Sequence, residues 1–120
     1  MGDLTRNFSR SEFKCKCGKC TNNYIDIRLV KGLQALRDLI GKPIIINSAT
    51  RCKAHNASVG GVPNSQHVQG RAADIRVNGM APETLAKKAE QIEVFRNGGI
   101  GIYDTFVHLD VRGHKARWRG

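Results

Sequence analysis

The clearest hydrophobic pattern in the chain runs from Asp26 to Ile40. Its apolar residues recur every three or four positions and therefore share one face of an amphipathic helix: Leu29, Leu33, Leu36 and Ile40. Asp26 can cap the start of this helix, and Gly41 followed by Pro43 can end it. Gly32, inside the pattern, is a poor helix former. We expect one long helix over residues 26–40.

Two stretches rich in apolar residues follow this helix. Residues 43–47 (PIIIN) predict a short buried strand, and residues 72–77 (AADIRV) predict a second one. Between them, residues 51–71 are rich in Gly, Asn, Ser and His, and they predict a long loop with one helical turn near residues 54–59. A loop of this length in a small domain usually serves a function.

The last third of the chain predicts a helix and a hairpin. Residues 82–95 begin with proline, carry apolar residues on one face and are followed by two glycines, which is typical of a helix and its end. Residues 100–103 and 106–111 predict two strands that turn at Asp104-Thr105. Together these elements predict an α+β fold, with two main helices against a small, mostly antiparallel sheet.

The composition suits one soluble domain. The 120 residues form a single domain over residues 1–120, with residues 1–24 as a cysteine-rich segment packed on it. Hydrophobic residues at 40% and charged residues at 25% are typical of a globular chain. No apolar run approaches the roughly 20 residues of a membrane-spanning helix, and no apolar stretch near the start resembles a secretory signal. We expect a monomer without a membrane span, synthesised in the cytoplasm without a signal peptide.

The net charge of +10 predicts an anionic partner. Nucleic acid and an anionic polymer of a bacterial cell wall would both suit it, and charge alone does not choose between them. Only one Trp, two Tyr and four Phe occur, and they do not alternate with basic residues as in a surface that stacks bases. This composition speaks against a nucleic-acid partner.

Four cysteines form a cluster of three and one distant residue: Cys15, Cys17, Cys20 and Cys52. In a reducing compartment such thiols more often bind metal or stay free than form disulfides. Four sulfurs would suit a second, structural zinc ion. A disulfide from Cys52 to one of the other three, and simple packed thiols, stay open as alternatives because no second C-x-x-C pair is present.

Two histidines and two aspartates carry the candidate chemistry. His67 lies in the long loop and Asp74 in the second strand, whereas His108 and Asp110 alternate on the last strand and so share a face of the sheet. The first three would form a ligand set that leaves one position of a zinc ion for water. By spacing alone, each histidine is more often a hydrogen-bonded loop or edge residue, and both interpretations stay open.

Four ordered motifs favour the metal interpretation: Ser48-Ala-Thr-Arg51, Asn64-Ser-Gln-His67, Gly70-Arg71-Ala-Ala-Asp74 and Phe106-Val-His108-Leu-Asp110. They resemble the zinc D-alanyl-D-alanine carboxypeptidase family, and more closely its short, phage-type branch, which includes endolysins. The resemblance covers most of the chain and implies a hedgehog-like α+β fold. It implies one catalytic zinc ion bound by His67, Asp74 and His108. It also implies that Arg51 holds the substrate and polarises the scissile carbonyl.

The general base departs from the family pattern. Many members carry a carboxylate three residues before the last zinc histidine, or a histidine two residues before it, where this chain has Thr105 and Phe106. Asp104, at the predicted turn, would reach the metal-bound water if the strand bulges. Asp110 is the second candidate, although its place beside His108 suits a residue that orients the ligand. We favour Asp104 and expect geometry to decide.

The resemblance implies a peptidoglycan hydrolase: a zinc metallopeptidase acting as a carboxypeptidase or endopeptidase at the bacterial cell wall, with phage- or prophage-type release. Ser65 and Gln66 would bind substrate, and Arg71 is expected as a surface charge. In the basic tail, residues 112–120, we expect Trp118 packed on the core between solvated arginines. Two alternatives belong to other classes: a non-catalytic, metal-containing wall-binding relative, and a basic zinc nucleic-acid-binding module.

Overall fold

The computed structural model describes residue 8 and residues 26–49 and 70–120. In these ranges one sheet contains five strands, which are β1 (Ile45–Ser48), β2 (Ala72–Arg76), β3 (Gly99–Ile102), β4 (Val107–Asp110) and β5 (Ala116–Arg119). Their order across the sheet is β1-β2-β4-β3-β5. All neighbours are antiparallel except β3 and β5, which are parallel. The prediction of a mostly antiparallel sheet is confirmed.

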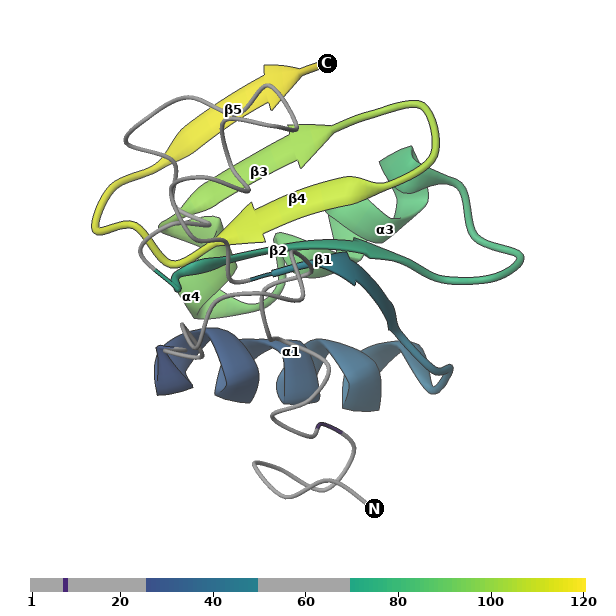
Figure 1. Ribbon diagram of the computed structural model, residues 1–120, viewed down its shortest axis with the longest axis horizontal. Coiled ribbons are helices and arrows are strands. Elements are labelled where there is room, and N and C mark those ends of the chain that lie inside the picture. Colours follow the sequence, from purple (N-terminus) through teal and green to yellow (C-terminus); the bar gives the residue numbers. More distant parts are fainter. Residues whose placement is uncertain (1–7, 9–25, 50–69) are drawn as a thin grey trace, which may run out of the picture.

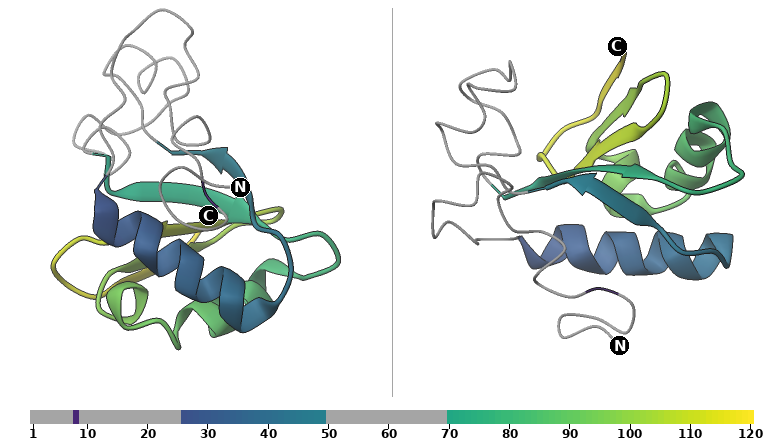
Figure 2. Two further views of the ribbon diagram at one scale, coloured as in Figure 1. Left: turned by 90° about the horizontal axis from the view of Figure 1, so that it is seen from below. Right: turned by 45° about the vertical axis from the view of Figure 1, so that its right-hand side comes forward.

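The helices α1 (Ile27–Ile40), α3 (Pro82–Ala89) and α4 (Glu93–Arg96) lie on one face of this sheet (Figures 1 and 2). The long helix predicted from the hydrophobic pattern is confirmed as α1. It begins after Asp26, whose carboxylate accepts a hydrogen bond from the backbone N–H of Arg28 at 2.9 Å. It ends at Gly41, which adopts the left-handed conformation that favours glycine, with φ of 74°.

The prediction of a single helix over residues 82–95 is wrong, because the chain forms two helices, α3 and α4, with a break between them. At the break, the N–H groups of Gln91 and Ile92 bond to carbonyls three residues back, and Ile92 is extended. The break redirects the chain so that Phe95 becomes fully buried in the core. Apolar periodicity continues across the break, so the pattern alone did not reveal it.

Two other boundaries differ from the prediction. The first strand lies at Ile45–Ser48, shifted toward the C-terminus from the expected residues 43–47. The segment expected as a basic tail contains β5, which is an edge strand of the sheet and pairs with β3. The pairing of β5 depends on β3, so a strand here was not visible in local sequence.

The hydrophobic core lies between the sheet and the helices. Ala73, Leu109 and Ile100 are neighbours on β2, β4 and β3, and all three are buried against the helices. Successive strand residues point to opposite faces. Asp74, His108 and Asp110 therefore lie on the face of the sheet opposite the helices.

Among the described helices, none combines the length and the apolar character needed to cross a lipid bilayer.

Candidate functional site

The candidate site is built on the two central strands of the sheet. Asp74 of β2 and His108 of β4 are direct cross-strand partners. Asp110 lies two residues further along β4 and points to the same face. The three side chains are buried, with exposed fractions of 8% for Asp74 and His108 and 0% for Asp110. The rigid centre of the sheet thus fixes three ionisable groups in one row.

Each ring nitrogen of His108 faces a carboxylate. Its Nδ1 lies 3.0 Å from Oδ1 of Asp74, and its Nε2 lies 2.8 Å from Oδ2 of Asp110. Asp110 also accepts a hydrogen bond from the backbone N–H of Gly99 at 2.8 Å. Arg112 donates to the same carboxylate through its backbone N–H, Nε and Nη2, at distances from 2.7 to 3.1 Å.

These contacts determine what His108 can do. An ionised Asp110 only accepts hydrogen bonds. Nε2 of His108 must therefore be protonated, and its N–H donates a hydrogen bond to Oδ2 of Asp110. In the neutral ring, Nδ1 then holds a lone pair that faces the Asp74 carboxylate. Two lone pairs at 3.0 Å repel unless a cation lies between them. The pair is therefore built for a cation, which is either a proton or a metal ion.

The pKa values follow from the same contacts. Burial by itself would lower the pKa of His108, but the hydrogen bonds to Asp110 and Asp74 outweigh it and raise that pKa above its ordinary value. Burial opposes ionisation of Asp110, yet the hydrogen bonds from His108 and Arg112 hold its pKa well below the usual range. Asp110 is thus an anion at neutral pH, and the site favours a cation beside His108.

Zinc suits this donor set. The 3.0 Å between Nδ1 and Oδ1 is close to the roughly 3.3 Å that separates two donors of a tetrahedral zinc ion with bonds of about 2.0–2.1 Å. The second ring nitrogen donates to a carboxylate, as zinc-bound histidines usually do. Within residue 8 and ranges 26–49 and 70–120, no cluster of three or more His, Cys, Asp or Glu side chains could hold a metal ion. The described residues thus supply two donors of the expected three.

Several predicted site residues lie outside the described part of the chain. They are the third expected zinc ligand His67, the substrate residues Arg51, Ser65 and Gln66, and the four cysteines Cys15, Cys17, Cys20 and Cys52. Arg71 is described and half-buried; the pKa of Asp26 is lowered mainly by the hydrogen bond from Arg28, and the charge of Arg71 adds to this effect.

Asp104 lies in the turn between β3 and β4. Its proposed role as a base required a bulge that would bring it back toward His108. Instead β4 pairs with both β2 and β3 in unbroken register. Asp104 is exposed, and it lines a small cavity of about 160 Å³ together with Glu83 and Arg119. The structure brings Asp110 to the Asp74–His108 pair and does not bring Asp104 there.

Strand β3 contributes to the site by having no side chains on the face that carries Asp74 and His108. Its sequence alternates Gly and Ile, so that Ile100 and Ile102 face the core while Gly99 and Gly101 face the site. A Cβ on Gly99 would collide with the Asp110 carboxylate, and one on Gly101 would collide with the indole of Trp118. The two glycines therefore leave space for the neighbouring side chains to lie flat over β3.

Two residues of the site were not predicted from the sequence, Arg112 and Trp118. Trp118 does not join the core; its ring lies 5.1 Å from that of His108, tilted by 51°, on the face opposite the helices. The Arg112 guanidinium lies 5.2 Å from the centre of the same indole. The alternation of His108, Asp110 and Arg112 was the signal that could have revealed Arg112, whereas Trp118 depends on the pairing of β5.

Comparisons with known proteins find a matching family model and similar curated proteins. A family model described as Peptidase M15 matches residues 6–110. The probable peptidoglycan L,D-endopeptidase MepK of Haemophilus influenzae is 36% identical over 76 residues, which are 62% of this chain and 39% of that protein. The zinc D-Ala-D-Ala carboxypeptidase of Streptomyces albus G is 41% identical over 87 residues, which are 72% of this chain and 34% of that protein. The match thus spans little more than a third of the length of these curated relatives.

Proposed function

The chain belongs to the peptidase M15 family, and from this membership we propose that it is a zinc-dependent peptidase of bacterial peptidoglycan. The observation that carries the proposal is the buried Asp74–His108 pair, in which Nδ1 and Oδ1 face each other at 3.0 Å and require a cation. The two named relatives, a probable L,D-endopeptidase and a zinc carboxypeptidase, support peptide bonds of the cell wall as the substrate class.

Asp74 Oδ1 and His108 Nδ1 would hold the zinc ion together with His67. When bound, zinc supplies an activated water molecule and polarises the scissile carbonyl. Asp110 accepts the Nε2–H of His108 and thereby keeps the Nδ1 lone pair directed at the metal position. Arg51 is proposed to hold the carbonyl oxygen of the substrate, and Ser65 and Gln66 to line the substrate groove.

Asp110 is unsuited to the role of general base. Both of its oxygens already accept hydrogen bonds from His108, Gly99 and Arg112, and its pKa lies far below neutrality. A base must take up a proton near the working pH. We therefore assign Asp110 to the orientation of His108. Asp104 is retained as a base candidate to be tested, although its place in the exposed turn does not favour it.

We propose action at the bacterial cell wall as a carboxypeptidase or endopeptidase, in the manner of an endolysin released by a phage or prophage. Anionic wall polymers would attract the basic surface of the molecule. Cys15, Cys17, Cys20 and Cys52 are proposed as a second, structural zinc site, with a disulfide as the alternative, and the monomer as the working form.

The experiment is release of muropeptides from purified peptidoglycan, followed by mass spectrometry. We expect hydrolysis that a chelator abolishes and added zinc restores. His67→Ala and Asp74→Asn should each abolish it and lower the bound zinc, whereas His114→Ala, at an exposed histidine, should leave it unchanged. Zinc binding without any hydrolysis would instead identify the non-catalytic wall-binding relative. Full activity of Asp74→Asn would contradict the proposed site.

A further inference from the structure

The contacts of His108 continue beyond its carboxylate neighbours to Arg112. Arg112 donates hydrogen bonds to the Asp110 carboxylate from its backbone N–H, its Nε and its Nη2, and the shortest of them is 2.7 Å. A guanidinium that donates two parallel hydrogen bonds fixes the plane of a carboxylate as well as its position. The plane of Asp110 in turn determines where Oδ2 meets the Nε2–H of His108. Arg112 is thus connected to His108 by two successive hydrogen bonds.

Arg112 also stabilises the charge on Asp110. The Asp110 side chain is fully buried, while that of Arg112 is 23% exposed. A buried carboxylate is costly unless it is paired and hydrogen-bonded. Without the guanidinium, the donors left to Asp110 within the described part of the chain would be the N–H groups of His108, Gly99 and the backbone of Arg112. The orientation of the imidazole would then depend on a much less constrained partner.

Trp118 closes the arrangement from β5. Its indole contacts the His108 ring, with 5.1 Å between the ring centroids. The Arg112 guanidinium lies over the same indole, 5.2 Å from its centroid, in a cation–π contact. The Nε1 of Trp118 donates a hydrogen bond to the hydroxyl of Tyr103 at 2.9 Å, which fixes the ring in its own plane. The absence of a side chain at Gly101 leaves the space that this ring occupies.

From these contacts we propose that Arg112 is a positioning residue for the metal site, acting through Asp110 on the ring of His108, with Trp118 holding its guanidinium in place. The inference rests on the proposed function in one respect, since it takes Nδ1 of His108 as a metal donor. In the structure Arg112 bonds to Asp110, and through that residue it orients the ring of His108 and its Nδ1 lone pair.

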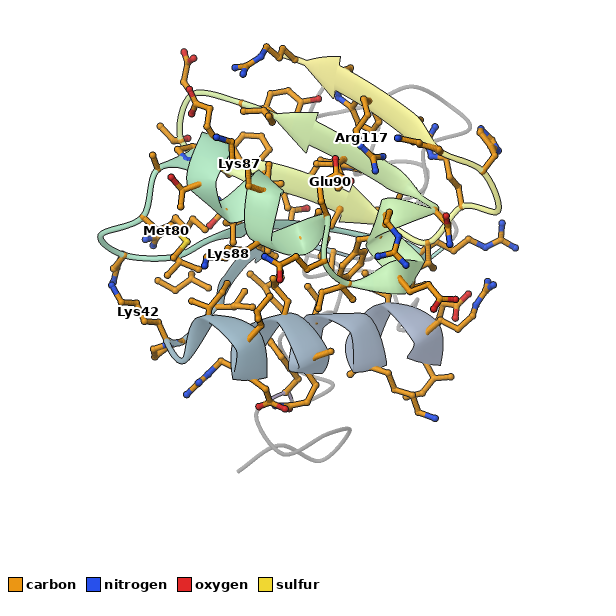
Figure 3. The ribbon with its side chains drawn as sticks, turned by 180° about the vertical axis from the view of Figure 1, so that it is seen from behind. Lys42, Met80, Lys87, Lys88, Glu90 and Arg117 are labelled. Carbon is orange, nitrogen blue, oxygen red and sulfur yellow. The ribbon has the colours of Figure 1, made fainter. Side chains whose placement is uncertain are left out.

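The chain offers a matched control in Arg117, another arginine of the C-terminal segment. Arg117 makes a two-pronged ion pair with Glu90, at 2.8 and 2.7 Å, and its side chain is 27% exposed. Figure 3 shows that this pair lies on the helix side of the sheet, beside α3. Arg112 and Arg117 therefore resemble each other in exposure and bonding, but only Arg112 is connected to His108.

The first measurement is zinc affinity by competition with a chromogenic chelator. We expect Arg112→Gln to weaken zinc binding by about 10-fold, the lower end of the roughly 10- to 100-fold range for direct partners of metal ligands, because Arg112 acts through Asp110. Arg112→Lys keeps the charge but lacks the planar fork, so it should recover only part of the loss. Arg117→Gln should lower the melting temperature and leave zinc affinity unchanged. An equal loss in both Gln variants would overturn the proposal, because the effect would then be one of general stability.

A double variant tests whether Arg112 acts through Asp110. If Arg112 acts on His108 only through its hydrogen bonds to Asp110, the effects of the two substitutions are not additive. Arg112→Gln should then add little to the loss of zinc affinity that Asp110→Asn produces alone. Independent, additive losses would contradict the proposed route. Melting curves of every variant identify any that fail to fold, and Arg112→Lys then serves as the milder probe.

A zinc-free measurement separates this inference from the proposed function. In protein labelled with ¹⁵N-histidine, the Nε2–H of His108 should give a signal protected from exchange, because it is bonded to buried Asp110. Arg112→Gln should lose that signal, while Arg117→Gln should retain it. Loss of the signal in a protein without peptidase activity would leave the positioning role intact and end the proposed function. Retention of the signal together with unchanged zinc affinity would overturn the positioning role.

Discussion

Asp104 and Asp110 are two carboxylates six positions apart whose surroundings give them different chemistry. Asp110 is enclosed at the end of β4, where His108, Gly99 and Arg112 donate to it and hold its pKa far below the usual range. Asp104 lies exposed in the turn that precedes the same strand. Residue type therefore did not distinguish an orienting carboxylate from a solvent-exposed one.

The exposed turn leads to a prediction for Asp104→Asn. Because β4 has no bulge that would bring residue 104 toward His108, we expect zinc content to be unchanged and the turnover of muropeptides to fall by less than the roughly 100-fold that loss of a general base causes. Steady-state kinetics on a defined muropeptide would measure this. A fall of 100-fold or more would mean that the turn closes over the site when substrate binds.

At the scale of elements, Gly32 shows tertiary packing overriding helix propensity. It lies within α1, where alanine would be the better helix former by about 1 kcal/mol. A Cβ at this position, however, would approach the side chains of Val94 and Phe95 more closely than packed atoms allow. The glycine permits α4 to lie against α1.

We therefore predict that Gly32→Ala lowers the free energy of unfolding by about 1–3 kcal/mol, as expected for an overpacked core. Denaturant unfolding followed by circular dichroism would measure the change. Lys31→Ala, at the exposed neighbour in the same helix, should be nearly neutral. A stabilised Gly32→Ala variant would show that helix propensity dominates and that α4 moves away at little cost.

The connection between α3, α4 and β5 depends on Arg117. Besides its ion pair with Glu90, it donates hydrogen bonds to the backbone carbonyls of Arg96, Gly98 and Ala116. The hydrogen bond from Arg117 is the largest cause of a pKa of Glu90 below its ordinary value. The Arg117 side chain thus connects α3, α4 and β5, which become neighbours only when the chain folds.

This pair predicts a pH-dependent difference in stability. Because the folded pKa of Glu90 is lowered, the stabilisation is present above the unfolded pKa of about 4.3 and is lost as the pH falls through the folded value. The Glu90 side chain is 42% exposed, so solvent screening limits the effect. We expect Glu90→Gln to cost about 0.2–1 kcal/mol at pH 7 and to match the parent protein near pH 3. A gap that persists in acid would exclude the ion pair as its cause.

At the scale of the whole molecule, the sheet separates two tasks. One face packs against α1, α3 and α4 to form the core, and the other carries the row of Asp74, His108 and Asp110. The chain as a whole carries a formal net charge of +10. Such a charge acts at long range on an anionic substrate, independently of the chemistry in the site.

We predict that binding to intact cell walls weakens as salt rises, because the screening length falls from about 10 Å at 0.1 M to about 3 Å at 1 M. Sedimentation of the protein with purified walls would measure the bound fraction. Walls stripped of anionic polymers should bind less protein and show a weaker salt dependence. Hydrolysis of a small soluble muropeptide should change little over the same range. Salt-independent binding to walls would contradict an electrostatic role for the basic surface.

Several features of this protein were determined by the sequence alone. The apolar period and caps of α1, the central strand β2, the β3–β4 hairpin and the mostly antiparallel sheet follow from patterns that each lie within a short stretch of chain. The proximity of Asp74 to His108 agrees with ordered motifs that already indicated a shared site. Such features are readable because neighbouring residues determine period, turn and cap.

Other features were decided only by the tertiary structure. The break between α3 and α4, the parallel pairing of β5 with β3, and the places of Arg112 and Trp118 beside His108 all depend on which strands meet and in what register. The opposite surroundings of Asp104 and Asp110 have the same origin. Register and burial are set by contacts between segments distant in the chain, and the free energy of those contacts is not encoded in any local pattern.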